Sequence, residues 1–92
     1  MANYRIFETE NFQDNIKHIR LAGSKNIQKK LETYVYPQLR DEPHYGLNIK
    51  KLRNYAPVTW RYRIGDWRFF YEIDEKDHIA YMIAVHHRKE AY

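Results

Sequence analysis

Three arginines flank a glycine-aspartate dipeptide in the segment VTWRYRIGDWRFFYEI, which runs from Val58 to Ile73. Arg61 and Arg63 precede the dipeptide, and Arg68 follows it. Guanidinium groups donate paired hydrogen bonds to phosphate oxygens and can stabilise the extra negative charge of a pentavalent phosphorane. The residue types therefore indicate a site for a phosphate group, provided that the fold brings the three side chains together.

A β-hairpin would bring them together. Gly65-Asp66 is a two-residue loop with glycine first, which suits a type II′ turn. The resulting register forms an apolar face from the pairs Ile64–Trp67, Tyr62–Phe69, Trp60–Tyr71 and Val58–Ile73. The other face carries Thr59, the three arginines, Phe70 and Glu72, and pairs Arg63 with Arg68. Like charges paired in this way destabilise a sheet, so the pair favours a polyanion ligand over an ordinary solvated face.

Two histidines and a basic tail follow the next expected strand, Ile79 to Val85, whose predicted core face is Ile79, Tyr81, Ile83 and Val85. Pairing Ile73 with Ile79 would place Ala84 opposite Arg68 and leave room above the sheet at Ala80 and Ala84. His86 would then lie beside the arginines, with His87, Arg88 and Tyr92 at the same end. Histidine transfers protons near neutral pH, and tyrosine can do so if neighbouring cations lower its pKa.

Metal chemistry is not expected. Adjacent histidines on a strand point to opposite faces, and neither has Asp, Glu or Cys at ligand spacing. No P-loop, dinucleotide fingerprint or Ser-His-Asp arrangement is present, and no cofactor is expected. RNA can be cleaved without metal if its 2′-hydroxyl is deprotonated and attacks the adjacent phosphate. The catalytic candidates are Arg61, Arg63, Arg68, Arg88, Tyr92, His87 and His86.

Positive charge is concentrated in one block. Residues 44–71 contain six Lys and Arg side chains and one carboxylate, a net charge of +5, whereas the whole chain carries +4. The block also contains Tyr45, Tyr55, Trp60 and Phe70, and cations with aromatics are typical of nucleic-acid surfaces. A solvated basic loop beside core aromatics is the alternative. The RNA-binding candidates are Lys50, Lys51, Arg53 and Phe70.

Length and composition predict one domain over residues 1–92, because a second core would leave too few residues for each half. Hydrophobic residues make up 43% of the chain, enough for a small core. The absence of cysteine fits a reducing compartment, and no signal peptide or membrane-spanning run is visible. We therefore expect a cytoplasmic protein without a membrane partner.

The expected fold is α+β. A strand over residues 3–8 precedes a helix that Thr9 caps and Gly23 ends. Ser24 would cap a second helix over residues 25–40, kinked near 33–37 by Pro37, with an apolar stripe of Ile27, Leu31, Val35 and Leu39. Residues 44–57 would form a connection anchored by Ile49 and Leu52. The result is a small, mainly antiparallel four-stranded sheet in the order β-α-α-β-β-β, with both helices on one face.

The chain resembles the RelE/ParE family of toxins of type II toxin–antitoxin systems. The resemblance spans nearly the whole chain and is carried by the Pro43…Gly46 turn, IKKL at 49–52, WRYRIGDWR at 60–68, YEI at 71–73 and HRKEAY at 87–92. In the RelE-like branch, the residues that act on the scissile phosphate correspond here to Arg61, Arg63, Arg68, Arg88 and Tyr92. Lysines often occur where this chain has Arg61 and Arg63, so proton transfer would fall to Tyr92, His87 or His86.

The resemblance implies a toxin that is a ribosome-dependent mRNA endonuclease (mRNA interferase), with mRNA in the ribosomal A site as its target. A ParE-like inhibitor of DNA gyrase without nuclease chemistry is the alternative, and an RNA-binding protein with a decayed site is a third reading. The family also implies a cognate antitoxin, which we expect to be partly disordered and to fold on binding.

Overall fold

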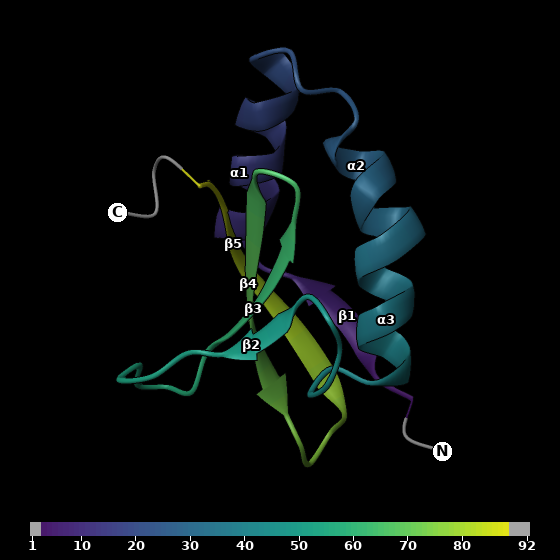
Figure 1. Ribbon diagram of the computed structural model, residues 1–92, viewed down its shortest axis with the longest axis vertical. Coiled ribbons are helices and arrows are strands. Elements are labelled where there is room, and N and C mark those ends of the chain that lie inside the picture. Colours follow the sequence, from purple (N-terminus) through teal and green to yellow (C-terminus); the bar gives the residue numbers. More distant parts are fainter. Residues whose placement is uncertain (1–2, 89–92) are drawn as a thin grey trace.

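A computed structural model describes residues 3–88, which form a five-stranded mixed sheet with two helical segments on one face (Figure 1). The elements are β1 (Arg5–Glu8), α1 (Glu10–Leu21), α2 (Ile27–Lys30), the π-helical η1 (Leu31–Val35), α3 (Tyr36–Asp41), β2 (Ile49–Lys51), β3 (Trp60–Ile64), β4 (Trp67–Asp74) and β5 (Ile79–His87). The strand order is β1-β5-β4-β3-β2. β1 runs parallel to β5, and the other pairs are antiparallel. The α+β class is confirmed, but the sheet has one strand more than predicted.

α1 forms where its sequence pattern predicts. The Thr9 hydroxyl accepts a hydrogen bond from the backbone N–H of Phe12 at 3.3 Å, which satisfies one of the free amides of the first turn. Phe12 and Ile16 are buried in the core. After the helix, Gly23 has φ of +111°, a conformation that favours glycine and turns the chain toward the second helical segment.

The second helical segment runs through α2, η1 and α3 without a break. Its predicted stripe is confirmed, since Ile27, Leu31, Val35 and Leu39 are all at most 1% exposed. The predicted irregularity before Pro37 takes the form of the π-helical turn Leu31–Val35, which accommodates a residue without an amide hydrogen. The predicted Ser24 cap is wrong. Asn26 occupies the cap position and makes no side-chain hydrogen bond to the helix.

The β3–β4 hairpin has the predicted register over most of its length. Ile64 faces Trp67, Arg63 faces Arg68 and Trp60 faces Tyr71. Gly65 has φ of +57°, as the first position of a type II′ turn requires. The predicted Val58–Ile73 pair is wrong, because β3 begins at Trp60 and Val58 is 49% exposed. Pro57 lacks the amide hydrogen that a longer ladder would need.

The predicted connection over residues 44–57 contains a strand. β2 pairs antiparallel with β3, with Ile49 opposite Tyr62 and Lys50 opposite Arg61. Sequence periodicity missed β2 because a three-residue strand with two lysines shows no alternation of apolar and polar residues. Ile49 packs against the core, and Leu52 is half-buried.

A β-bulge changes the predicted register of β5. Phe70 faces Ala84 whereas Tyr71 faces Met82, so Ile83 is an extra residue on β5. Ile73 therefore pairs with Ala80 rather than Ile79, and Arg68 pairs with His86 rather than Ala84. The bulge also moves the residues of β5 before Ile83 to the opposite face of the sheet from the one predicted. The buried residues of β5 are Ala80, Met82 and Val85, not the predicted Ile79, Tyr81 and Ile83.

Polar side chains from the start of α1 hold the bulge. The Thr9 hydroxyl donates to the Met82 carbonyl at 2.7 Å, and the Asn11 side chain donates to the Ile83 carbonyl at 2.9 Å. The Asn15 side-chain oxygen accepts from the Val85 N–H at 2.9 Å. These hydrogen bonds satisfy backbone groups of β5 where its pairing with β1 ends. The start of α1 thereby fixes the backbone of β5 just before His86 and so helps to set the orientation of that residue.

The core lies between the sheet and the two helical segments. Phe69, Tyr71 and Met82 of the sheet and Phe12 and Leu31 of the helices are fully buried within it. Between residues 3 and 88, no helix is long and apolar enough to cross a membrane.

Candidate phosphate-binding site on the open sheet face

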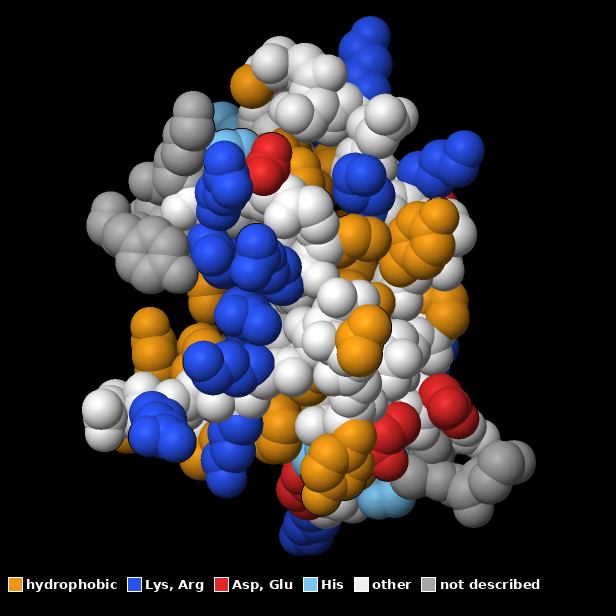
Figure 2. Space-filling view, viewed as in Figure 1, with side chains coloured by type: hydrophobic (Ala, Val, Ile, Leu, Met, Phe, Trp, Pro, Cys, Tyr) orange, Lys and Arg blue, Asp and Glu red, His pale blue; other side chains and the backbone are white. Residues whose placement is uncertain are grey.

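The face of the sheet turned away from the helices, here called the open face, carries two rows of side chains. The first row is Arg63 on β3, Arg68 on β4 and His86 on β5, which are consecutive cross-strand neighbours. The second row is Lys50, Arg61, Phe70 and Ala84. Figure 2 shows Lys and Arg side chains gathered in a column over the sheet.

The first row places two guanidinium groups and an imidazole side by side. Arg63 is exposed and lies directly opposite Arg68, which retains only 8% of its exposure. His86 completes the row, and its ring meets the Phe70 ring edge-on at a centroid distance of 5.2 Å. Phe70 thus limits the orientations of the imidazole. The row combines charge that can stabilise a phosphate with a group that can transfer a proton.

The second row extends the positive surface toward β2. Lys50 and Arg61 are cross-strand neighbours, and Phe70 lies next to Arg61. Ala84, opposite Phe70, has the smallest side chain of the row. The room predicted above the sheet at Ala80 is absent, because the bulge turns Ala80 into the core.

Asp66 in the β3–β4 turn holds Arg88 at the same end of the sheet. Arg88 Nε lies 3.4 Å from Asp66 Oδ1, and the Arg88 backbone N–H donates to the Asp66 carbonyl at 2.8 Å. Arg88 is therefore placed at the edge of the first row, where the sequence predicted it.

Three predicted site residues, His87, Lys51 and Arg53, lie within residues 3–88 but away from the open face and its edge. His87 points to the helix face, where its ring meets Trp67 at 5.0 Å and its Nε2 lies 3.9 Å from Asp66 Oδ2. Lys51 also points to that face, with its Nζ 5.8 Å from the centre of the Trp60 ring. Arg53 is exposed in the loop after β2, and Tyr92 lies outside the described residues. Within residues 3–88, no group of three or more His, Cys, Asp or Glu side chains could hold a metal ion.

The structure also contains an ionic cluster around His44 that sequence reasoning missed. His44 Nδ1 lies 2.8 Å from Glu42 Oε2, and His44 Nε2 lies 2.6 Å from Glu75 Oε2. The Tyr4 hydroxyl donates to Glu75 Oε1 at 2.9 Å. The cluster thus joins the end of α3, the start of β1 and the β4–β5 turn. Sequence reasoning could not reveal the whole cluster, because Tyr4 and Glu75 are far from His44 in sequence and only Glu42 is close to it.

The pKa values of this cluster support a charged histidine. Burial alone would lower the pKa of His44, but the hydrogen bonds to Glu75 and Glu42 outweigh burial and raise it. The hydrogen bonds from His44 lower the pKa of Glu42 and of Glu75. Burial, followed by the hydrogen bond to Glu75, raises the pKa of Tyr4. An imidazolium that donates to two carboxylates explains all these directions.

Comparison with solved structures identifies the fold. The toxin–antitoxin complex RelBE2 from Mycobacterium tuberculosis contains a chain with a TM-score of 0.76 and 22% identity, covering 94% of this chain and 99% of that one. A chain of the archaeal RelE–RelB complex from Pyrococcus horikoshii OT3 matches with a TM-score of 0.64 and 20% identity, and the match covers 96% of this chain and 97% of that one. A chain of the YoeB dimer from Staphylococcus aureus matches with a TM-score of 0.68 and 19% identity, and the match covers 90% of this chain and 94% of that one.

No curated protein matches the chain. A family model does match, over residues 6–92, and it describes the ParE toxin of the type II toxin–antitoxin system parDE. This match covers nearly the whole sequence, including every described strand and helix except the first residue of β1. The chain therefore belongs to the ParE toxin family and is a toxin of a type II toxin–antitoxin system within the RelE/ParE superfamily.

Proposed function

We propose that this toxin is a metal-independent endoribonuclease that cleaves mRNA in the ribosomal A site. The observation that carries the proposal is the row of Arg63, Arg68 and His86 on the open face. Three features support it: two cations lie opposite each other at an electrostatic cost, an imidazole is adjacent to them, and a third arginine lies in the next row. Similarity in fold to the RelE and YoeB toxins supports it further, as an analogy between scaffolds.

In the proposed reaction, a base on the protein takes the proton of the 2′-hydroxyl, and the 2′-oxygen attacks the adjacent phosphorus. The bond from phosphorus to the 5′-oxygen of the next nucleotide breaks, and an acid gives that oxygen a proton. The products are a 2′,3′-cyclic phosphate and a 5′-hydroxyl. Arg61, Arg63, Arg68 and Arg88 would stabilise the phosphorane charge, since guanidinium groups remain protonated.

Proton transfer would fall to His86 and Tyr92. His86 faces the arginines, whereas the placement of His87 beside Trp67 on the helix face argues against a role for it. Lys50 and Phe70 would contact the RNA beside the scissile phosphate, and Arg53 would extend that contact outside the sheet. Lys51 would contact the RNA from β2, at the edge of the sheet. No metal or other cofactor enters this scheme.

The test is cell-free translation with the purified toxin and an mRNA whose 5′ and 3′ ends are mapped. Cleavage at positions in phase with codons, and dependent on ribosomes, is the expected result. An Arg63→Gln variant serves as the inactive control, and Lys29→Gln, an exposed change on α2, serves as the active one. Intact mRNA at toxin concentrations that stop translation in this extract would refute the proposal.

Inhibition of DNA gyrase is the second candidate, because the matching family model is named for the ParE toxin. In that case the open-face residues would bind a protein surface and perform no chemistry. Gyrase-dependent DNA breaks with intact mRNA, in the same extract, would select this activity.

We also propose a cognate antitoxin that is partly disordered before it binds, since the M. tuberculosis and P. horikoshii neighbours are toxin–antitoxin complexes. Tyr45, Leu47, Tyr55 and Val58 are at least 49% exposed and lie in the same segment as Lys50, Lys51 and Arg53. A segment with acidic and apolar side chains would match this surface. The test is to express the toxin without an antitoxin in cells that are sensitive to related toxins. Normal growth of those cells would contradict the proposal of a neutralising partner.

A further inference from the structure

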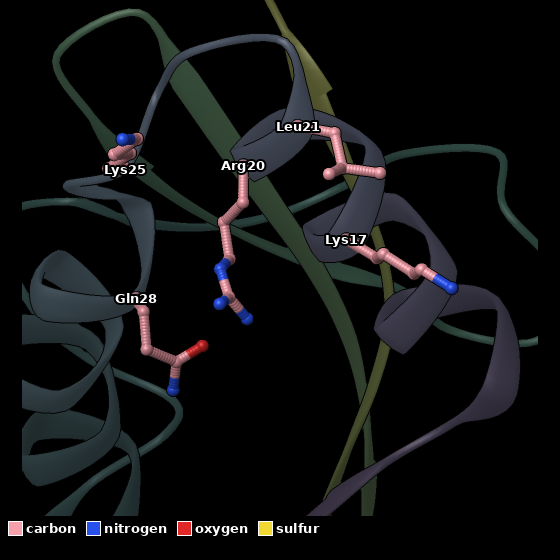
Figure 3. Close-up of a pocket in the computed structure, with 5 residues that line it drawn as sticks. All are labelled: Lys17, Arg20, Leu21, Lys25 and Gln28. Atoms are coloured by element: carbon pink, nitrogen blue, oxygen red, sulfur yellow. The ribbon is translucent and has the colours of Figure 1, made fainter.

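A cavity of about 730 Å³ lies between α1 and α2, on the side of the molecule away from the open face. It is lined by Lys17, Arg20, Leu21, Lys25 and Gln28. In Figure 3, the Arg20 guanidinium and the Gln28 amide extend toward each other across the gap between the two helices, whereas Lys17 extends away from it. We call this space the helix cavity. Its size is that of a pocket for a small ligand or a nucleotide unit.

The helix cavity is positively charged, and no described residue places a carboxylate in its wall. Three of its five lining residues are cations, one is an amide and one is aliphatic. The adjoining cavity, which shares Lys17, Arg20 and Gln28, includes Glu8, but the Glu8 carboxylate accepts a hydrogen bond from the Tyr36 hydroxyl. Gln28 Nε2 donates one hydrogen bond to the Glu32 carboxylate at 3.0 Å, which leaves its second N–H, together with the Arg20 and Lys25 side chains, as donors to an anion.

Helix electrostatics explain Arg20 but not Lys25. Arg20 lies in the last turn of α1, where a cation is favourable without any ligand. Lys25 lies just before α2, and Lys29 and Lys30 follow it in a turn that has no acidic residue. Positive charge at the start of a helical segment is unfavourable. A bound anion between Arg20 and Lys25 would offset this cost.

The helix cavity is linked to the end of the sheet that carries the arginines. Lys25 also lines a second cavity, of about 380 Å³, together with Lys30 and Trp67. Trp67 is the first residue of β4 and precedes Arg68 of the open face. A strand of nucleic acid that leaves the Arg63–Arg68 end of the open face can thus pass over the β3–β4 turn and meet Lys25 next.

We propose that the helix cavity binds a backbone phosphate of the same RNA strand that lies on the open face. Arg20 would donate paired hydrogen bonds to phosphate oxygens, Lys25 would supply a second charge, and the Gln28 amide would donate a further hydrogen bond. An acidic protein segment is a poorer occupant, because such segments also need apolar pockets and Leu21 is the one aliphatic residue among the described residues of the wall. This inference rests on the proposed action on RNA.

Binding of a short single-stranded RNA with 2′-O-methyl groups, which cannot be cleaved, tests the inference by fluorescence anisotropy at several salt concentrations. The variant Arg20→Gln with Lys25→Gln is compared with Lys29→Gln with Lys76→Gln, which removes the same charge from exposed positions outside the helix cavity. The cavity variant should weaken binding and reduce the slope of log K against log salt by ~0.7, because one phosphate is no longer neutralised. The control should retain the slope. Equal slopes for the two variants would overturn the inference.

Nuclear magnetic resonance separates this inference from the proposed function. On addition of the same RNA, the Arg20 Nε–H and Gln28 side-chain amide resonances should shift together with those of Arg63 and Arg68. Shifts confined to resonances of the open face would refute phosphate binding in the helix cavity and would not affect the nuclease proposal. If polyglutamate at equal concentration shifted Arg20 and Gln28 as strongly as RNA, the cavity would be a site for acidic proteins and the inference would be wrong. Loss of mRNA cleavage alone concerns only the proposed function.

Discussion

At the scale of single residues, the open face combines an electrostatic cost with a chemical use. Arg63 and Arg68 repel each other across two strands, and nearby His86 adds another group that becomes positive when protonated. An anion in contact with both guanidinium groups would convert this repulsion into binding energy. Site residues that lower stability while they support function are common in proteins.

Replacing Arg63 should therefore separate function from stability. Arg63→Gln should reduce RNA cleavage by ~10²–10³, since one preorganised donor to the phosphate is removed. The same change should raise the free energy of unfolding by ~0.2–1 kcal/mol, because the like-charge pair disappears. Single-turnover cleavage and chemical denaturation measure the two effects. A variant that loses both stability and cleavage would show that Arg63 is a structural residue.

Arg68→Ala should also lower both RNA affinity and cleavage.

The two histidines should differ because the strand places them on opposite faces. His86→Ala should lower single-turnover cleavage by ~10²–10⁴, the usual contribution of general acid–base catalysis, with ribosome binding retained. His87→Ala should leave cleavage nearly unchanged, since His87 lies beside Trp67 on the helix face. Tyr92→Phe, which keeps the ring but removes the hydroxyl, tests the other candidate. Loss of activity in His87→Ala but not in His86→Ala would reverse the assignment.

At the scale of elements, α1 controls the site through β5. Its side chains Thr9, Asn11 and Asn15 satisfy the backbone around the Ile83 bulge, and His86 follows three residues later. At the other end of the sheet, the hydrogen bonds of His44 to Glu42 and Glu75, with that of Tyr4 to Glu75, tie α3, β1 and the β4–β5 turn together. Both devices use polar groups to join elements that are distant in the sequence.

Asn15→Ala should destabilise the protein by ~1–3 kcal/mol, because the Val85 N–H loses its acceptor in a partly buried position. Since Val85 precedes His86, cleavage should fall as well, while binding to ribosomes persists. Gln13→Ala, a change of similar size at an exposed position of α1, is the control. Thermal unfolding and single-turnover assays check both effects. Equal stability of the two variants would show that water replaces the Asn15 side chain as the acceptor.

The His44 cluster predicts a dependence of stability on pH. His44 has a folded pKa above its ordinary value of 6.5, so its contribution is complete below pH 6.5 and is lost as the pH rises through the folded pKa. Glu42 and Glu75 have folded pKa values below 4.5, so their contribution is present above pH 4.5 and is lost as the pH falls through those values.

The melting temperature should therefore be highest between about pH 4.5 and 6.5 and should decrease above that range. In His44→Gln the decrease above pH 6.5 should be much smaller, because the titrating group is gone. A profile of identical shape in the two proteins would assign the pH dependence to other groups.

At the scale of the whole molecule, charge is distributed unevenly. The chain has a net charge of +4, and residues 44–71 alone carry +5. The cations of β2, β3 and β4 other than Lys51 belong to the open face, while Lys25, Lys29 and Lys30 lie on the helical side. Such a molecule should approach polyanions with one preferred side and bind them in a salt-dependent manner.

Four phosphate contacts from Lys50, Arg61, Arg63 and Arg68 would give a slope of about −3 for log K against log salt with single-stranded RNA. Lys50→Gln combined with Arg63→Gln should reduce the magnitude of that slope by ~1.4. Anisotropy titrations between low and physiological salt provide the measurement. A slope near zero in the unmodified protein would exclude phosphate binding on the open face.

Local patterns in the sequence were sufficient for much of the fold. The alternation around Gly65-Asp66 determined the hairpin register, and with it the Arg63–Arg68 pair, because one face of both strands had to be apolar. The four-residue spacing from Ile27 to Leu39 likewise determined the buried side of the second helical segment. These signals are local, since each depends on residues within one element or one turn.

Only the tertiary structure decided the register of β5 and the composition of the His44 cluster. The bulge at Ile83 is held by Thr9, Asn11 and Asn15, whose polar side chains have the composition of an ordinary helix surface. Hydrogen bonds between a side chain and the backbone of a distant strand leave no periodic pattern, so sequence periodicity could not show which residue of β5 was extra. That extra residue places His86 opposite Arg68 and turns His87 toward Trp67.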